Sequence, residues 1–107
     1  MKRLLFIAAF AATTAHAEFK DGNTLYKELT SDVYFNQGVA LGYITGVADS
    51  TMGIMFCAPS NVTAGQIQDM VKNYLTNTPA IRHVSADVIV NYVLKTAWPC
   101  AKKNSKI

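Results

Sequence analysis

Apolar residues recur along this chain three and four positions apart, as in amphipathic α-helices, and no segment shows the strict alternation of a half-buried β-strand. The pattern predicts an all-α fold, a compact bundle of about four helices. We expect these helices from about Asn23 to Asp32, from about Phe35 to Phe56, from a cap at Thr63 through Leu75, and from Ala86 to about Trp98.

Capping signals stand at three of the expected helix starts. Asp21 or Asn23 can cap the first helix. Thr63 and Gln66 form the S/T-x-x-E/Q pattern of a capping box, in which each side chain bonds the other residue's backbone N–H. Ser85 is the expected N-cap of the fourth helix.

The third and fourth helices differ in how much of their surface is apolar. The third has one apolar face, at Ile67, Met70, Val71, Tyr74 and Leu75. The fourth is apolar nearly all round, at Val88, Ile89, Val90, Tyr92, Val93, Leu94 and Ala97. A helix without a polar face is typical of a buried central element, so we expect the fourth helix at the centre of the bundle.

The second helix carries small residues at every fourth position, namely Gly38, Gly42, Gly46 and Ser50. Each interior glycine costs a helix roughly 1 kcal/mol relative to alanine, so the stripe predicts that another backbone approaches closely. Asp49 interrupts the apolar run, which disfavours a membrane helix. We expect close helix packing in a soluble core, and a second subunit is the other partner that would explain the stripe.

The first segment has the three parts of a secretory signal peptide: a basic start, an apolar run from Leu4 to Ala12, and a small-x-small cleavage site at residues 15–17. The apolar run is shorter than the roughly 20 residues that a membrane span needs. We therefore expect a signal peptide (1–17), a helical domain (18–101) and a flexible basic tail (102–107). Export to the periplasm follows, with no membrane span after cleavage.

Cleavage removes most of the apparent basicity. The whole chain has 10 Lys and Arg against 7 Asp and Glu, and the loss of Lys2 and Arg3 leaves 10 − 2 = 8 against 7. No basic surface studded with aromatic residues is visible, so nucleic acid is not an expected partner.

Two cysteines, Cys57 and Cys100, remain in the exported chain of 107 − 17 = 90 residues. Such a small domain has a small core, and an oxidising compartment favours a disulfide between them. The bridge would contribute roughly 4 kcal/mol on the chain-entropy model. One histidine and two distant thiols do not make a four-ligand zinc site, so we expect no metal or cofactor.

The stretch TNTPAIRHVSAD, residues 76–87, joins the third and fourth helices and holds the last histidine. Neither a nucleophile with its base nor a carboxylate pair is evident near His83, so we do not expect an enzyme. Two interpretations stay open. Arg82 and His83 can be scaffold residues, with Arg82 bonding helix-end carbonyls. Alternatively, the stretch binds a protein partner through Asn77, Thr78, Pro79, Arg82 and His83, in which case Arg82→Glu should weaken binding and leave thermal unfolding nearly unchanged.

The motifs from Gly22 to Cys100 resemble the periplasmic immunity proteins of type VI secretion, the family founded on resistance-associated proteins that neutralise peptidoglycan amidases. The similarity lies in GYITGVAD, in the C-x-P…VT-x-GQ join, in the N-x-P-x-x-RH-x-x-A connection and in the closing WPC, all in one order. It implies a small, helical, exported protein without enzymatic activity. Such a protein binds a toxin, often as a dimer, and blocks the toxin's active site.

The chain departs from the family at one feature. Many members have a second cysteine pair, in the first helix and early in the second, where this chain has Leu29 and Ala40. Both partners of that pair are missing together, so no lone thiol is left. The departure bears on the margin of stability and on which toxin is recognised.

A different class of function also fits a small exported helical protein with one disulfide: a periplasmic chaperone activated by acid, or another non-enzymatic binding module on the same scaffold. Such a chaperone opens when carboxylates or histidines change charge, and the exported chain offers seven acids and one histidine. Reversible loosening at pH 2 to 3 would distinguish it from an immunity protein.

Overall fold

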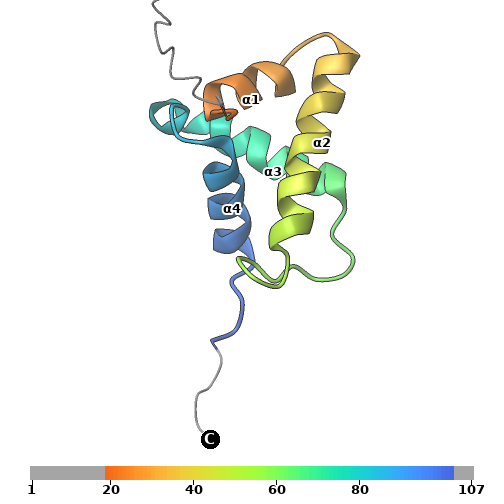
Figure 1. Ribbon diagram of the computed structural model, residues 1–107, viewed down its shortest axis with the longest axis vertical. Coiled ribbons are helices and arrows are strands. Elements are labelled where there is room, and N and C mark those ends of the chain that lie inside the picture. The colour runs from red at the N-terminus through yellow and green to blue at the C-terminus, as the bar shows by residue number, and fades with distance from the viewer. Residues whose placement is uncertain (1–18, 103–107) are drawn as a thin grey trace, which may run out of the picture.

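Four α-helices follow one another along the chain in a computed structural model that describes residues 19–102 (Figure 1). The elements are α1 (Gly22–Leu29), α2 (Tyr34–Thr51), α3 (Ala64–Asn77), the 3-10 turn η1 (Pro79–Ile81) and α4 (Ala86–Ala97). The predicted all-α bundle is confirmed, and the only β-type pairs in the described part are isolated bridges. The expected signal peptide (1–17) and residues 103–107 of the expected tail lie outside that part.

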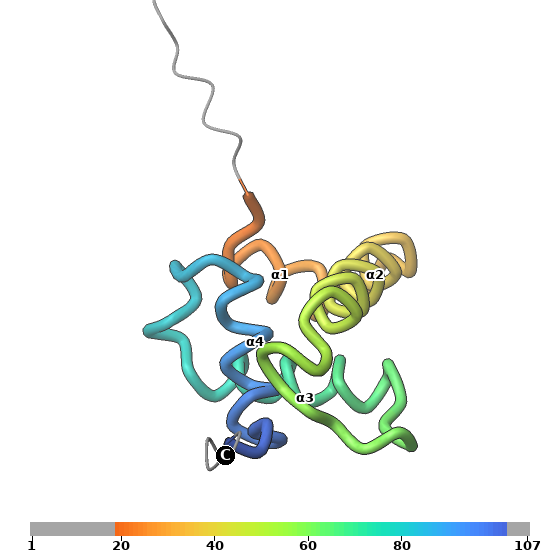
Figure 2. Tube along the Cα trace, turned by 60° about the horizontal axis from the view of Figure 1, so that its bottom comes forward, coloured from red at the N-terminus to blue at the C-terminus, as the bar shows by residue number. Residues whose placement is uncertain are grey.

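The helices are arranged around one core. α2 and α4 pack side by side and run in the same direction, α1 lies near their starts, and α3 crosses both (Figures 1 and 2). Each helix buries apolar residues one turn apart, as the spacing predicts. The buried set comprises Leu25 and Leu29 of α1; Ala40, Ile44 and Ala48 of α2; Ile67, Val71 and Leu75 of α3; and Ala86, Ile89, Val90, Val93 and Leu94 of α4. None of the described helices is both long and apolar enough to cross a membrane.

Two helices end earlier than the apolar spacing indicates. α1 stops at Leu29: the Thr30 N–H still bonds Tyr26 O (3.0 Å), but Ser31 N turns to Glu28 O (3.3 Å), and the chain then bends toward α2. α2 stops at Thr51 and not near Phe56. Gly53 there adopts a left-handed φ of +79° and donates to Phe56 O (2.7 Å), a conformation that favours glycine. The turn brings the apolar ring of Phe56 into the core, where it is fully buried.

Two of the predicted caps form as expected. Asp21 caps α1, with Oδ1 accepting from Thr24 N (2.8 Å), and Thr63 Oγ1 accepts from Gln66 N (3.1 Å). The return bond of the capping box, from the Gln66 side chain, is absent within residues 19–102, so Gln66 does not complete the box.

The glycine stripe of α2 does not pack inside the chain. Gly38, Gly42 and Gly46 are exposed, and a Cβ built on any of them would meet no heavy atom within 4 Å. The expectation of close packing in the chain's own core is therefore wrong. α2 has apolar residues on both sides, and the side that turns inward is the one with Ala40 and Ile44.

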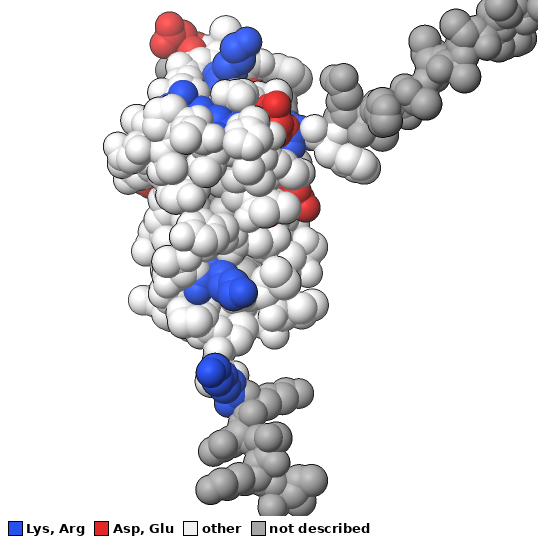
Figure 3. All heavy atoms as spheres, turned by 90° about the vertical axis from the view of Figure 1, so that its left-hand side faces the viewer, with Lys and Arg blue, Asp and Glu red and all other residues white. Residues whose placement is uncertain are grey.

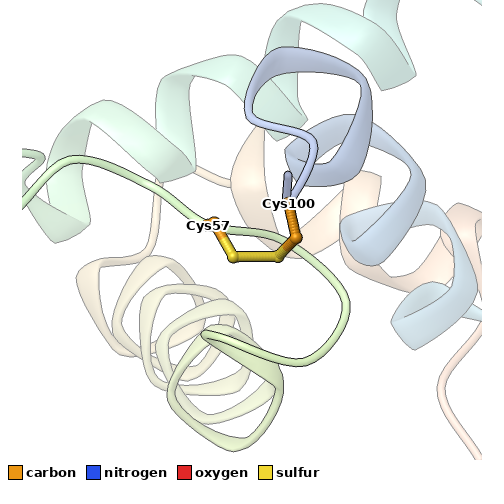
Figure 4. Close-up of a disulfide and its surroundings, with 2 residues drawn as sticks. All are labelled: Cys57 and Cys100. Carbon is orange, nitrogen blue, oxygen red and sulfur yellow. A yellow bond between two sulfur atoms is a disulfide. The ribbon is translucent and has the colours of Figure 1, made fainter. Parts of the chain in front are cut away.

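Cys57 and Cys100 form the predicted disulfide, with their Cα atoms 4.8 Å apart (Figure 4). The two residues follow α2 and α4 respectively, so the bridge joins the segments that leave those helices. Cys57 N also donates to Trp98 O (2.9 Å). Covalent and hydrogen-bonded links thus hold together two segments that are 43 residues apart in the sequence.

Candidate functional site

The connection between α3 and α4 is anchored by Arg82. Its Nε donates to Leu75 O (2.7 Å) and its Nη2 to Thr76 O (3.4 Å), which are carbonyls at the end of α3. The guanidinium carbon lies 3.7 Å from the ring centre of Tyr26 in α1, a cation–π contact. Arg82 therefore does what the scaffold interpretation expects of it: it satisfies helix-end carbonyls and holds three elements together.

The backbone of this connection is held against α1 as well. Gly22 N donates to Val84 O (2.9 Å), Asn23 N to Arg82 O (2.7 Å), and Ala86 N to Lys20 O (2.9 Å). Gly22 is required here, because a Cβ at this position would lie 2.5 Å from Ile89 Cδ1 and 2.8 Å from the Arg82 carbonyl oxygen. The connection is thus fixed at both ends.

The five residues predicted to bind a partner lie together on this connection but differ in exposure. Asn77, Pro79 and His83 are exposed, whereas Thr78 and Arg82 are half-buried. His83 makes no side-chain hydrogen bond to any residue in the described range. The structure therefore brings three solvent-facing side chains onto one rigid turn, and their role in binding stays a prediction.

Ser85 takes the predicted N-cap position of α4 but not the predicted hydrogen bond. Its hydroxyl donates to Asp87 Oδ1 (2.6 Å) and accepts from no helix N–H. A hydroxyl can donate and accept at once, but the orientation of Ser85 here serves only the charge-assisted bond to the carboxylate. The first N–H of α4, that of Ala86, is satisfied by Lys20 O, so the chain leading into α1 supplies part of the cap.

Charged groups gather around Lys20, which lies just before the start of α1. Lys20 Nζ lies 2.5 Å from Glu28 Oε2 and 5.0 Å from the ring centre of Tyr43. Burial, with a smaller contribution from the Asp87 carboxylate, raises the pKa of the Tyr43 hydroxyl above its usual value. These contacts hold the start of α1 against α2, and they offer no reactive pair.

An apolar surface that the sequence did not predict lies beside the connection, and we call it the α4 groove. It is a hollow of about 170 Å³ lined by Tyr74, Ile81, Val84, Val88, Ile89 and Tyr92. Within it Val88 and Tyr92 keep 53% and 55% of their surface exposed. The expectation that α4 is buried all round is therefore wrong: one apolar side packs in the core, and the other lines this groove.

The face that contains α4 and the connection has few charges. Figure 3 shows that face, with charged side chains near the top of the view, one basic group on the lower body and another at its base, and a largely uncharged middle with acidic groups at its edges. Residues 19–102 contain no cluster of three or more His, Cys, Asp or Glu side chains that could hold a metal ion.

Comparison with known proteins agrees with this geometry. The family model of the Rap1a immunity proteins, a type VI secretion immunity family, matches residues 21–100, nearly all of the described chain. A search of the curated proteins found no match. The family resemblance drawn from the sequence motifs is confirmed, and membership implies that the chain binds a cognate toxin. This chain belongs to the Rap1a immunity protein family.

Proposed function

We propose that this chain is a periplasmic immunity protein that binds a peptidoglycan amidase effector of type VI secretion and occludes its active site. The observation that carries the proposal is the family match, because it spans residues 21–100 and so takes in every helix of the bundle. Inhibition would be steric and would need no cofactor and no catalytic residue of the chain itself.

The connection between α3 and α4 is suited to a steric block. Its backbone is bonded to α1, and Arg82 holds it to the end of α3, so little conformational freedom is left to lose on binding. Asn77, Pro79 and His83 would supply the contacts with the toxin, with Thr78 beside them. Arg82 would act by positioning this turn.

The disulfide supports the periplasm as the site of action. Structural disulfides persist in oxidising compartments, and the described chain has no free cysteine. The signal peptide expected over residues 1–17 would direct the chain there.

A homodimer would explain the glycine stripe of α2. Gly38, Gly42 and Gly46 leave the outer side of the helix open, and the apolar side chains of Phe35 and Val39 are exposed near its start. A flat helix face without side chains lets a second backbone approach closely, and a two-fold interface uses the same face on both copies. We propose that α2 packs against α2 of a second copy.

The amidase proposal is tested by mixing the purified chain with the effector encoded by the neighbouring gene and measuring hydrolysis of peptidoglycan peptides. We expect inhibition that is complete at one chain per toxin active site. The double substitution Asn77→Ala/His83→Ala should weaken binding about tenfold, because contacts on the connection are lost. Asn61→Ala, at another exposed asparagine, is the matched control and should bind normally. An effector that stays fully active beside excess wild-type chain would refute the proposed function.

The dimer is tested separately by sedimentation. Wild-type chain and Gly65→Leu should sediment as dimers, whereas Gly42→Leu should be monomeric. Both glycines are exposed helical positions with open space at Cβ, and only Gly42 lies on the stripe. A dimeric Gly42→Leu variant would show that α2 is not the dimer face.

A further inference from the structure

We propose that the α4 groove is a specificity pocket of the toxin interface, which holds one large uncharged aliphatic or aromatic side chain on a convex segment of the toxin. This inference rests on the proposed function and adds to it the surface that selects the partner. It starts from α4, which has a second apolar side that the bundle core does not use.

The lining of the groove determines what can enter it. Aliphatic and tyrosine side chains alone form it, so a charged group placed there would lose its hydration without gaining a partner. The rings of Tyr74 and Tyr92 lie at one side with their centres 5.5 Å apart. Tyrosines around an apolar hollow are typical of the residues that dominate protein interfaces. The size of the hollow fits one large side chain.

A second hollow, of about 340 Å³, continues the groove along α4. It shares Val88 and Tyr92 with the groove and is also lined by Met55, Asn91 and Lys95, with Asp87 at its edge. The Oδ1 atom of Asn91 is buried and has no hydrogen-bond partner in the described chain. That oxygen is closed to solvent, so the part of this hollow that a toxin can reach is formed mainly by the exposed side chains of Met55, Val88 and Tyr92.

The toxin explains the groove better than a second copy of this chain does. A two-fold contact needs a surface that complements itself, and a concave apolar hollow complements a convex segment. The flat, open side of α2 meets the requirement for self-association. It is a different surface from the groove, which is lined by α4, α3 and the connection and by no residue of α2. The groove is also continuous with the connection proposed to enter the toxin, because Ile81 and Val84 belong to both.

The test uses two identical substitutions at positions of matched exposure. Val88 in the groove and Val33 before α2 keep 53% and 55% of their surface exposed, so neither Val→Glu change disturbs the core. With the effector of the neighbouring gene as the probe, we expect Val88→Glu to weaken binding about tenfold or more, since it places a charge in an apolar contact. Val33→Glu should bind like wild type, and both variants should keep the thermal midpoint of unfolding.

A second measurement detects contact at the groove in the wild-type chain, without any substitution. Methyl signals of Ile81, Val84 and Val88 in nuclear magnetic resonance spectra should shift on addition of the effector, whereas that of Val33 should not. If wild-type chain binds the effector but Val88→Glu binds equally well and the groove methyls do not shift, the pocket assignment is wrong and the immunity function stands. If wild-type chain binds no effector, both proposals fail.

Discussion

Arg82 links three elements through one side chain, and its contacts change what a substitution there should do. Sequence motifs left two roles open for it, a scaffold role and a partner contact. Its hydrogen bonds to Leu75 O and Thr76 O, with the cation–π contact to Tyr26, show the scaffold role directly. A spacing pattern cannot separate the two roles, because both favour an arginine after a helix end.

Arg82→Glu should lower the free energy of unfolding by about 1–3 kcal/mol, the combined range for a charged hydrogen bond and a cation–π contact. The new carboxylate would also face the negative end of α3. This reverses the expectation from sequence that unfolding stays nearly unchanged. Thermal denaturation followed by circular dichroism measures the effect. His83→Glu, at the exposed neighbour, is the control and should unfold near the wild-type midpoint. Equal midpoints for wild type and both variants would mean that the contacts of Arg82 do not stabilise the fold.

At the scale of the element, apolar spacing predicted where each helix lies in the sequence, but it did not always predict which side of the helix faces the core. α3 has one apolar face, and its predicted residues Ile67, Val71 and Leu75 are buried. α2 and α4 have apolar or small residues on two sides, so periodicity alone could not decide which side faces the core. The α4 groove and the open glycine stripe both result from this ambiguity. Helix ends were missed where a turn, such as that at Gly53, brings a distant apolar residue into the core.

Two glycine substitutions separate an open position from a crowded one. Gly42→Ala should raise the free energy of unfolding of the monomer by about 1 kcal/mol, because alanine is the better helix former and the space at Cβ is empty. Gly22→Ala should lower it by about 1–3 kcal/mol, because the new methyl group would collide with Ile89 and the Arg82 carbonyl.

Urea denaturation at low protein concentration, where self-association does not contribute, measures both changes. Gly65→Ala is the control for Gly42→Ala and should also not destabilise the chain, since Gly65 is another exposed helical glycine with open space at Cβ. A Gly42→Ala chain less stable than wild type under these conditions would mean that the outer side of α2 is packed within the monomer.

At the scale of the whole molecule, the Cys57–Cys100 bridge joins the ends of α2 and α4. The sequence predicted it from the compartment and the cysteine count, and a bridge that closes 43 residues should contribute about 4 kcal/mol on the chain-entropy model. Cys57→Ser/Cys100→Ser should therefore shift the urea midpoint markedly to lower concentration. Wild-type chain reduced with a phosphine should show the same shift, which controls for the serine hydroxyls. An unchanged midpoint in both samples would contradict a stabilising role.

Acid should weaken this molecule only slightly, which distinguishes a rigid binding protein from a chaperone that opens at low pH. No aspartate or glutamate is buried in the part of the chain that the structure describes, so protonation of a core carboxylate does not open the bundle. Hydrogen bonds from Thr24 lower the pKa of the Asp21 carboxyl below its usual 3.8. The stabilisation from this cap is therefore present above the unfolded pKa and is lost as the pH falls through the lower folded value.

Circular dichroism and dye binding between pH 7 and pH 2.5 measure this response. We expect helical signal to persist at pH 3, with a drop in stability confined to the region below about pH 4, where Asp21 takes up its proton in the unfolded chain first. Asp21→Asn should flatten that drop, because asparagine also caps helices but does not titrate. Reversible loss of helix at pH 3, with dye binding and suppressed aggregation of a client protein, would instead favour the chaperone. Such a result would show that protonation of surface carboxylates is enough to open the bundle, as an acid-activated chaperone requires.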